Sequence, residues 1–374
     1  MALNFNNRSE SFVRVLLHAF KLDYTLSMAL FSLVSVGLII LYSASGEDVG
    51  VLLRQIFRLG LAFALLVFVA QITPHQLKLW TPWVYVFGVL MLVAVFLFGD
   101  IGKGAQRWLN LGIVRFQPSE MMKIAVPMMV AWYLSERSVP PRFWDVVVAV
   151  IIVLVPMVLI VEQPDLGTAL LVGAAGFLAL FLAGISWRIM ITGGVLAAAA
   201  VPLMWFKFMH DYQRQRVLTF LNPESDPLGS GYHIIQSKIA IGSGGVYGKG
   251  WTNGTQSHLD FLPERSTDFI FAVFGEEFGW FGAVILLGMY AFLIYRCWRI
   301  ALRARDRYSR VLGGALTLTF FVYVFVNVGM VIGLLPVVGV PLPLISYGGT
   351  SMVTLMAGFG MLMSINSDRR LSQG

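Results

Sequence analysis

The residues best suited to chemistry lie in a polar stretch, about residues 209–268, between two strongly hydrophobic parts of the chain. The stretch is rich in cations, acids and glycines, and it ends in Glu264-Arg265-Ser266-Thr267-Asp268, directly before the apolar run Phe269-Ile270-Phe271-Ala272-Val273. A carboxylate is thus placed where water meets lipid. Ionisable groups at such positions are usually functional, which suggests chemistry on a substrate that is both anionic and attached to a lipid.

Cations recur in other polar connectors that we expect on the same side of the membrane. Arg107 lies in such a connector, and Arg214, Arg216 and Lys249 lie in the polar stretch itself. Long loops are exempt from the rule that positive charge stays inside, so part of this excess carries no information. A cationic rim above a hydrophobic groove nevertheless suits a pyrophosphate whose lipid tail lies in the bilayer.

Glu120 and Lys123 form a second group of candidates. Pro118 suits the first turn of a helix, so the two charges are expected on one helical face, about one turn inside the membrane. One interpretation is a salt bridge that only makes two buried charges tolerable. The other is a pair that lines a functional cavity, and we favour it because charges inside a membrane usually have such a role.

Asp165 is a further carboxylate at the start of an expected helix, within Gln163-Pro164-Asp165-Leu166-Gly167-Thr168. It could cap that helix by accepting hydrogen bonds from the exposed amides of the first turn. It could equally belong to a functional site. The residues alone do not decide between these two interpretations.

The glycine-rich turn from Gly242 to Gly250 superficially resembles a nucleotide-binding loop. A P-loop requires glycine, four residues, and then Gly-Lys-Ser/Thr, but here Ser243 occupies the place of the first glycine and Gly250 that of the hydroxyl residue. The nucleotide interpretation therefore fails. Two interpretations remain open: backbone amides that approach an anion beside Lys249, or a plain flexible turn.

The composition shows what kind of scaffold must position these residues. Of 374 residues, 57% are hydrophobic and 13% charged, whereas soluble domains are about 25% charged. The apolar runs are close to the ~20 residues of a membrane-spanning helix and are too long for barrel strands. We expect an all-α, polytopic integral membrane protein, with one membrane domain over residues 1–374 and about ten transmembrane helices. The expected spans are 23–43, 55–73, 79–98, 119–135, 143–162, 166–185, 189–208, 269–295, 312–334 and 346–365.

The distribution of basic residues predicts the orientation. Arginines crowd the connector 296–310, and Arg369-Arg370 follow the last span, so both are expected in the cytoplasm with the basic amino end. Both termini are then cytoplasmic, and the large loop between spans seven and eight faces the opposite side. No signature of nucleic-acid binding is present, because these arginines lack interleaved aromatics in a soluble module. Cys297 is the only cysteine, which excludes an intramolecular disulfide.

The most specific motif lies near the carboxyl end. Asn327, followed after five residues by Gly333-Leu334-Leu335-Pro336-Val337-Val338-Gly339-Val340-Pro341-Leu342-Pro343-Leu344-Ile345-Ser346-Tyr347-Gly348-Gly349-Thr350-Ser351, resembles the signature of the SEDS family (shape, elongation, division and sporulation). Further matching motifs are Arg115-Phe116-Gln117-Pro118-Ser119-Glu120, Asp211-Tyr212-Gln213-Arg214-Gln215-Arg216, the segment around Asp165, and Glu264 to Phe269. The chain is most similar to the member that acts in cell elongation in Gram-negative bacteria. Physically, the prolines and glycines must break the helix, either to line a cavity or to form a packed re-entrant turn.

This resemblance implies a peptidoglycan glycosyltransferase of the bacterial inner membrane that polymerises lipid II on the periplasmic face. It implies a class B penicillin-binding protein and the elongation machinery as partners. It marks Asp268 as the residue on which activity depends, and it places Arg107, Glu120, Lys123 and Asp165 around the cavity. The alternative for Asp268 is a helix N-cap, since it and the two hydroxyl residues before it all suit that position.

The expected reaction is an inverting displacement, in which the 4-hydroxyl of an acceptor N-acetylglucosamine attacks C1 of a donor N-acetylmuramic acid and expels undecaprenyl pyrophosphate. One general base on the acceptor hydroxyl suffices, and Asp268 is the candidate. Arg107, Lys123, Arg214 and Arg216 are expected to stabilise the leaving pyrophosphate, and Lys249 to contact the substrate. No cofactor is required by the sequence, although a divalent cation (Mg²⁺ or Mn²⁺) could serve the same purpose. A lipid II flippase and a non-catalytic scaffold are the alternative functions.

Overall fold

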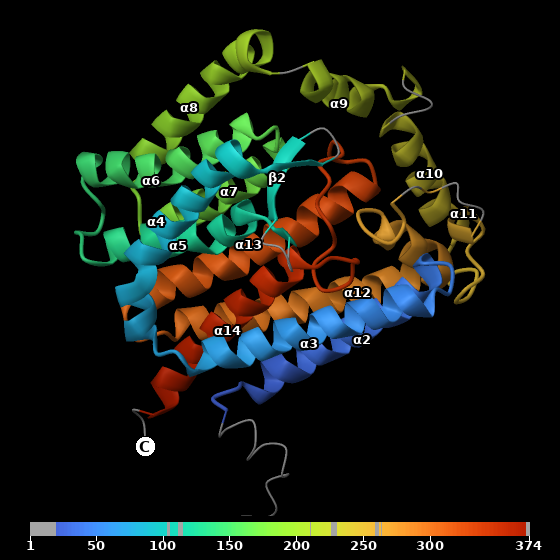
Figure 1. Ribbon diagram of the computed structural model, residues 1–374, viewed down its shortest axis with the longest axis horizontal. Helices are drawn as coiled ribbons and strands as arrows, with labels where there is room; N and C mark the ends of the chain where they lie inside the picture. The colour runs from blue at the N-terminus through green and yellow to red at the C-terminus, as the bar shows by residue number, and fades with distance from the viewer. Residues whose placement is uncertain are drawn as a thin grey trace, which may run out of the picture.

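The computed structural model describes residues 20–102, 105–110, 115–209, 211–225, 230–258, 262 and 264–371. The chain folds into long helices that lie side by side (Figure 1). The predicted all-α membrane protein is confirmed. The exception among the described residues is a short antiparallel sheet, ordered β1-β2-β3, in the connector before the fourth expected span.

Each expected span coincides with a helix. These are α2 (Tyr24–Ala44), α3 (Val49–Gln71), α4 (Pro74–Phe98), α5 (Pro118–Ser135), α6 (Phe143–Glu162), α7 (Leu166–Leu182), α8 (Trp187–Leu203), α12 (Ile270–Leu302), α13 (Arg307–Val331) and α14 (Thr350–Leu371). Within the described residues, six of them are long and apolar enough to cross a membrane. The protein is therefore a multi-pass membrane protein, and the count of ten spans stays a prediction.

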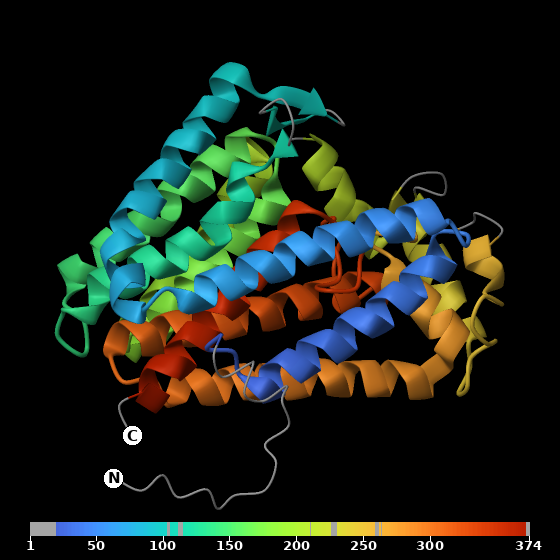
Figure 2. The same ribbon diagram turned by 60° about the horizontal axis from the view of Figure 1, so that its bottom comes forward.

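Helix α13 is the central element of the bundle. Of its most apolar window 67% is buried, against 39% or less for the other five long apolar helices that the structure describes. It packs against α5, α7, α12 and α14, while α14 also packs along α3 (Figure 2). A helix that is apolar on every side is expected at the core of a bundle, and residues carried by α13 are accordingly held by several neighbours.

One end of the bundle carries the polar connectors. Strands β1 (Asp100–Gly102), β2 (Ala105–Asn110) and β3 (Arg115–Phe116) lie there, as does the turn between α2 and α3. The large loop folds into η1 (Met204–Phe208), α9 (Asp211–Leu221), η2 (Pro223–Ser225), α10 (Ser230–Ser243) and α11 (Thr255–His258). Helices α8, α9 and α10 follow one another around the edge of the bundle in Figure 1. None of the α8 side chains that the structure describes is buried, so this helix lies on the periphery.

Candidate active site

The non-helical segment between α13 and α14 packs against the start of α7 and against Asp268. Proline and glycine end α13 at Val331, and α14 begins only at Thr350, as the sequence predicts. Along this segment Val338 packs on Gly167 of α7, where a Cβ would lie 2.9 Å from the carbonyl oxygen of Val338. The next residue, Gly339, has a φ of +78° and borders Asp268, with an ideal Cβ 3.5 Å from Oδ2. This non-helical part of the motif, residues 332–349, is the signature segment. It runs between the start of α7 and Asp268.

Asp268 lies in the turn that leads into α12, and it is half-buried. The structure places Phe269, not Asp268, at the N-cap of α12, and the Phe269 side chain makes no capping bond. The interpretation of Asp268 as a helix cap is therefore wrong. Its carbonyl oxygen accepts a hydrogen bond from Asn327 Nδ2 of α13 at 2.9 Å, which ties the residue to the most buried helix.

Asp165 shows the opposite arrangement. It is the N-cap of α7, and its carboxylate accepts bonds from Thr168 N at 3.2 Å and Thr168 Oγ1 at 2.9 Å. Gln117 Nε2 donates to it at 3.2 Å, and Arg107 Nε of β2 lies 3.7 Å away. Arg107 also donates to the carbonyl oxygen of Pro164 at 2.6 Å. The capping interpretation of Asp165 is confirmed, and the structure brings Arg107 and Asp165 together as one cluster.

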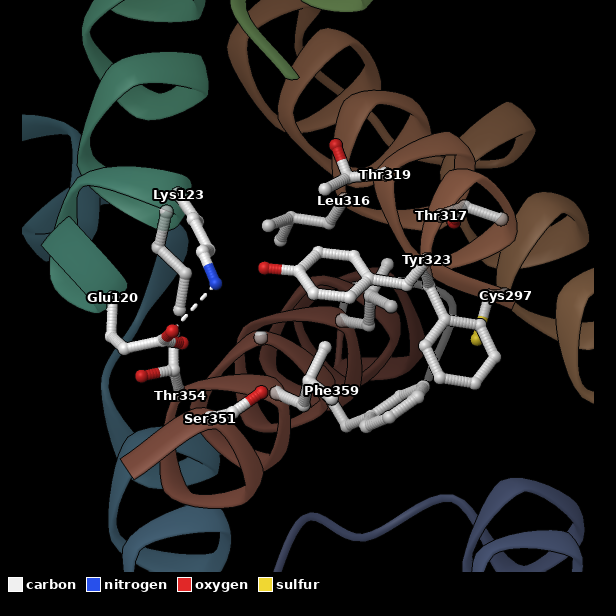
Figure 3. Close-up of a pocket in the computed structure, with 15 residues that line it drawn as sticks. Glu120, Lys123, Cys297, Leu316, Thr317, Thr319, Tyr323, Ser351, Thr354 and Phe359 are labelled. Carbon is white, nitrogen blue, oxygen red and sulfur yellow. Dashed lines mark hydrogen bonds and ion pairs between the residues drawn. The ribbon is translucent and has the colours of Figure 1, made fainter. Parts of the chain in front are cut away.

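Glu120 and Lys123 lie on one face of α5, which begins at Pro118 as predicted. Lys123 Nζ donates to Glu120 Oε1 at 2.6 Å, and both residues are buried. Figure 3 shows that Tyr323 of α13 directs its hydroxyl end towards this pair, and Lys123 Nζ lies 4.9 Å from the centre of its ring. The ion pair of the first interpretation is present, and Tyr323 is a third member that sequence reasoning missed.

A small cavity lies beside Glu120 and Lys123. Its walls come from α5, α12, α13 and α14, and polar atoms of Thr319, Ser351 and Thr354 contribute to them (Figure 3). Its volume is about 30 Å³, whereas one water molecule needs roughly 10–15 Å³ by the same measure. The cavity can hold water but not a sugar headgroup. Contact of Glu120 and Lys123 with substrate therefore stays a prediction.

The glycine-rich turn packs on α12. Lys249 N and Gly250 N donate to the carbonyl oxygens of Glu276 and Glu277, each at 3.0 Å, beside the break in α12 at Gly279. These amides are therefore used within the protein. The turn is thus bonded to α12 through its main chain, and both interpretations of it stay predictions. Lys249 Nζ binds Glu276 Oε1 at 2.7 Å, so its expected contact with substrate stays a prediction.

The remaining predicted cations lie in the large loop. Arg214 donates to the carbonyl oxygens of Trp205 and Phe206, at 2.8 and 3.2 Å, which ties α9 to η1. Arg216 lies in α9, but its side chain is outside the described residues. Among the residues that the structure describes, no group of three or more His, Cys, Asp or Glu side chains could hold a metal ion.

Asn327 is part of the motif, but its sequence context predicts no particular function for it. It is fully buried, and it lies four residues after Tyr323 on α13, so both side chains are on one helical face. A polar residue inside an otherwise apolar run was the available signal. Its partners, which are main-chain carbonyls far away in the sequence, could not be read from that signal.

Comparisons with known proteins agree with this architecture. The family model described as cell cycle protein, of the FtsW, RodA and SpoVE type, matches residues 20–371. The peptidoglycan glycosyltransferase MrdB of Escherichia coli strain K12 is 54% identical over 350 residues, which cover 94% of this chain and 95% of MrdB.

Solved structures extend the match to the fold. A chain from a study of the structural coordination of polymerization and crosslinking by a peptidoglycan synthase complex aligns with a TM-score of 0.81 and 32% identity, over 93% of this chain and 98% of that one. Thermus thermophilus rod shape determining protein RodA aligns with a TM-score of 0.71 and 30% identity, over 93% and 97% of the two chains. The chain belongs to the FtsW, RodA and SpoVE family, which confirms the resemblance found in its sequence.

Proposed function

We propose that this protein is a peptidoglycan glycosyltransferase that polymerises lipid II into β-1,4-linked glycan strands during cell elongation. The observation that carries the proposal is the 54% identity with a peptidoglycan glycosyltransferase over almost the whole of both chains. The site adds physical support. A half-buried carboxylate, Asp268, lies at the start of a membrane helix, beside a segment that also contacts α7 and α13.

In the proposed reaction Asp268 is the general base. Its carboxylate takes the proton from the 4-hydroxyl of the acceptor N-acetylglucosamine while that oxygen bonds to C1 of the donor N-acetylmuramic acid. The bond from C1 to the pyrophosphate oxygen breaks, and undecaprenyl pyrophosphate leaves with the electron pair. Configuration at C1 inverts in this single displacement, so no protein nucleophile is needed, and a base of this kind contributes about 10²–10⁴-fold to the rate.

Charge stabilisation of the pyrophosphate would come from cations near this end of the bundle. Arg107 is the best placed of them, because its cluster with Asp165 lies at the start of α7, against the signature segment. Arg214 and Arg216 of α9, and Lys123 and Glu120 of α5, remain proposed contributors, as does Lys249. A divalent cation such as Mg²⁺ or Mn²⁺ would arrive with the pyrophosphate, since the described residues offer no preformed cluster for one.

We further propose that the protein works with a class B penicillin-binding protein that cross-links the product. The similarity to a chain of a peptidoglycan synthase complex supports this. The basic connector 296–310 supports a location in the bacterial inner membrane with both termini in the cytoplasm and the large loop in the periplasm. The whole chain from 1 to 374 is proposed to be one membrane domain.

Incubation of the purified protein with lipid II in detergent, followed by separation of the glycan products by size, tests the function. Polymer that forms without any other enzyme is the expected result. A flippase would give no polymer but would move lipid II between the leaflets of a vesicle, and a scaffold would do neither. Either of these outcomes contradicts the proposal.

A further inference from the structure

Asn327 binds the main chain of the proposed catalytic residue from inside the bundle. Its side-chain Nδ2 donates to the carbonyl oxygen of Asp268 at 2.9 Å and to that of Val340 at 2.7 Å. Both partners are acceptors only, so the amide must direct its NH₂ group towards them. Asn327 Oδ1 is buried without a hydrogen-bond partner among the described residues. The side chain therefore joins α13, the signature segment and Asp268 through one amide nitrogen.

Two further donors from the signature segment hold the residues just before Asp268. Tyr347 N donates to the carbonyl oxygen of Ser266 at 2.8 Å, and Ser346 Oγ donates to that of Thr267 at 2.5 Å. Three consecutive carbonyl groups, those of residues 266, 267 and 268, are thus each bound by a different donor. These donors fix the path of a turn that has no regular secondary structure of its own.

The two donor residues of the signature segment, Ser346 and Tyr347, are themselves held by helix α3. The Ser346 carbonyl oxygen accepts a hydrogen bond from Gln55 Nε2 of α3 at 3.4 Å, and the guanidinium of Arg58 lies 4.5 Å from the centre of the Tyr347 ring. The three bonds to residues 266, 267 and 268 go to main-chain carbonyl oxygens of the turn, so they position Asp268 through its backbone. A catalytic base needs this kind of support, because displacement by about 1 Å can lower a rate 10²-fold.

We propose that Asn327 is a positioning residue for Asp268, and that the signature segment together with α13 is a main-chain clamp on the catalytic turn. This inference rests on the proposed role of Asp268 as the general base. It gives the motif from Asn327 to Tyr347 a task distinct from substrate contact. It also links Asp268 to the Glu120–Lys123 pair, because Tyr323 stands one helical turn from Asn327.

The test measures kcat and KM for lipid II polymerisation with the full-length Asn327→Ala protein. Its control is Thr81→Val, which removes a buried hydroxyl that is 2.8 Å from Tyr308 Oη on α13. Tyr308 is about 28 Å along the helix from Asn327. Both changes delete a buried bond between α13 and its surroundings, but only Asn327→Ala releases Asp268. Thermal unfolding of both variants shows how much folded protein each assay contains.

We expect Asn327→Ala to lower kcat by about tenfold to a hundredfold with little change in KM, while Thr81→Val stays within about twofold of the unchanged protein at a similar loss of thermal stability. Asn327→Asp has the same shape but directs oxygens towards both carbonyl groups, so its kcat should fall at least as far as that of Asn327→Ala. Ser346→Ala serves if the Asn327 variants fail to fold. It releases Thr267 in the turn, and it also removes the bond that Ser346 Oγ accepts from Leu342 N within the signature segment; its kcat should also fall.

The inference is overturned if the kcat of Asn327→Ala, or of Ser346→Ala in its place, equals the kcat of Thr81→Val. A rise in KM without a fall in kcat would also overturn it. Asp268→Asn, measured beside them, separates this failure from failure of the proposed function. If the unchanged protein makes no polymer, or if Asp268→Asn makes it at the same rate, the function or the base assignment is wrong. If those two behave as proposed, only the positioning role has failed.

Discussion

Asp165 and Asp268 both stand close to the start of an apolar helix, α7 and α12 respectively, but the protein holds them through different atoms. The carboxylate of Asp165 caps α7 and also meets Gln117 and Arg107. Asp268 precedes the N-cap of α12, and it is its carbonyl oxygen that Asn327 binds. Asp165 is held through its side chain, which accepts hydrogen bonds from Thr168 and Gln117, whereas Asn327 holds Asp268 through its main chain.

The difference supports separate tasks for the two carboxylates: Asp165 stabilises the start of α7, and Asp268 is the proposed general base. An acid whose oxygens already accept several hydrogen bonds within the fold is poorly placed to accept a proton from a substrate hydroxyl. Asn327 fixes the position of Asp268 through the main chain, and a defined position is what a catalytic base requires. Glu120 belongs with Asp165 in this respect, since Lys123 binds its carboxylate directly.

The largest effect on stability is expected at the ion pair of Glu120 with Lys123. Lys123→Met leaves Glu120 as a buried charge without its ammonium partner, which should lower the free energy of unfolding by about 3–5 kcal/mol. Denaturant or thermal unfolding of the purified protein measures it. The double variant Glu120→Gln/Lys123→Met, which removes both charges at nearly constant volume, should recover most of the loss. If Lys123→Met is as stable as the unchanged protein, Glu120 and Lys123 are not a buried ion pair.

A smaller effect is expected at Asp165. Asp165→Ala removes the cap of α7 and should lower the free energy of unfolding by about 1–2 kcal/mol, whereas Asp165→Asn keeps a good capping side chain and should lose less. Asp306→Ala, which removes the N-cap of α13 at the other end of the bundle, gives the effect of a cap alone. If Asp165→Ala does not change stability, its side chain does not have the structural role that distinguishes it from Asp268.

The smallest effect is expected at an exposed carboxylate remote from the site. Lys78 binds Glu136 at 2.9 Å, and this hydrogen bond, with the charge of Lys78, lowers the pKa of Glu136 below its ordinary 4.5. A lowered folded-state pKa stabilises the protein above the unfolded-state pKa, and the gain is lost as the pH falls through the folded value. Glu136→Gln should therefore be slightly less stable at neutral pH and low salt, and equally stable at a pH below the folded-state pKa. A deficit that persists at that acidic pH would contradict this.

Much of the fold could be predicted because the relevant signals are local. Apolar runs near the length of a span predicted the helices, Pro118 marked the start of α5, and the spacing of Glu120 and Lys123 placed them on one face. The position of Asp165 before a helix offered capping as one of two interpretations, and the structure shows the cap. These features depend on residues that are close in sequence.

The parts that sequence reasoning missed depend on distant main-chain atoms. Hydrophobicity gives no sign that the turn at Gly250 will bond to the carbonyl groups of a broken α12, or that Asn327 will find the carbonyl oxygen of Asp268, 59 residues away. The short sheet and α9 were also missed, because their polar segments have little hydrophobic periodicity. Lys249 was assigned to the substrate from its charge alone, whereas the structure pairs it with Glu276.

The rate of glycan polymerisation by purified Asp268→Asn protein tests the central claim most directly, with Asp306→Asn as the matched control. Both variants change one aspartate near a helix start to its amide, and Asn retains the capping function at residue 306. We predict that Asp268→Asn polymerises lipid II about 10²–10⁴-fold more slowly than the unchanged protein, at equal binding of lipid II, while Asp306→Asn is unaffected. Polymerisation by Asp268→Asn within a few-fold of the unchanged protein would contradict the assignment of Asp268 as the general base.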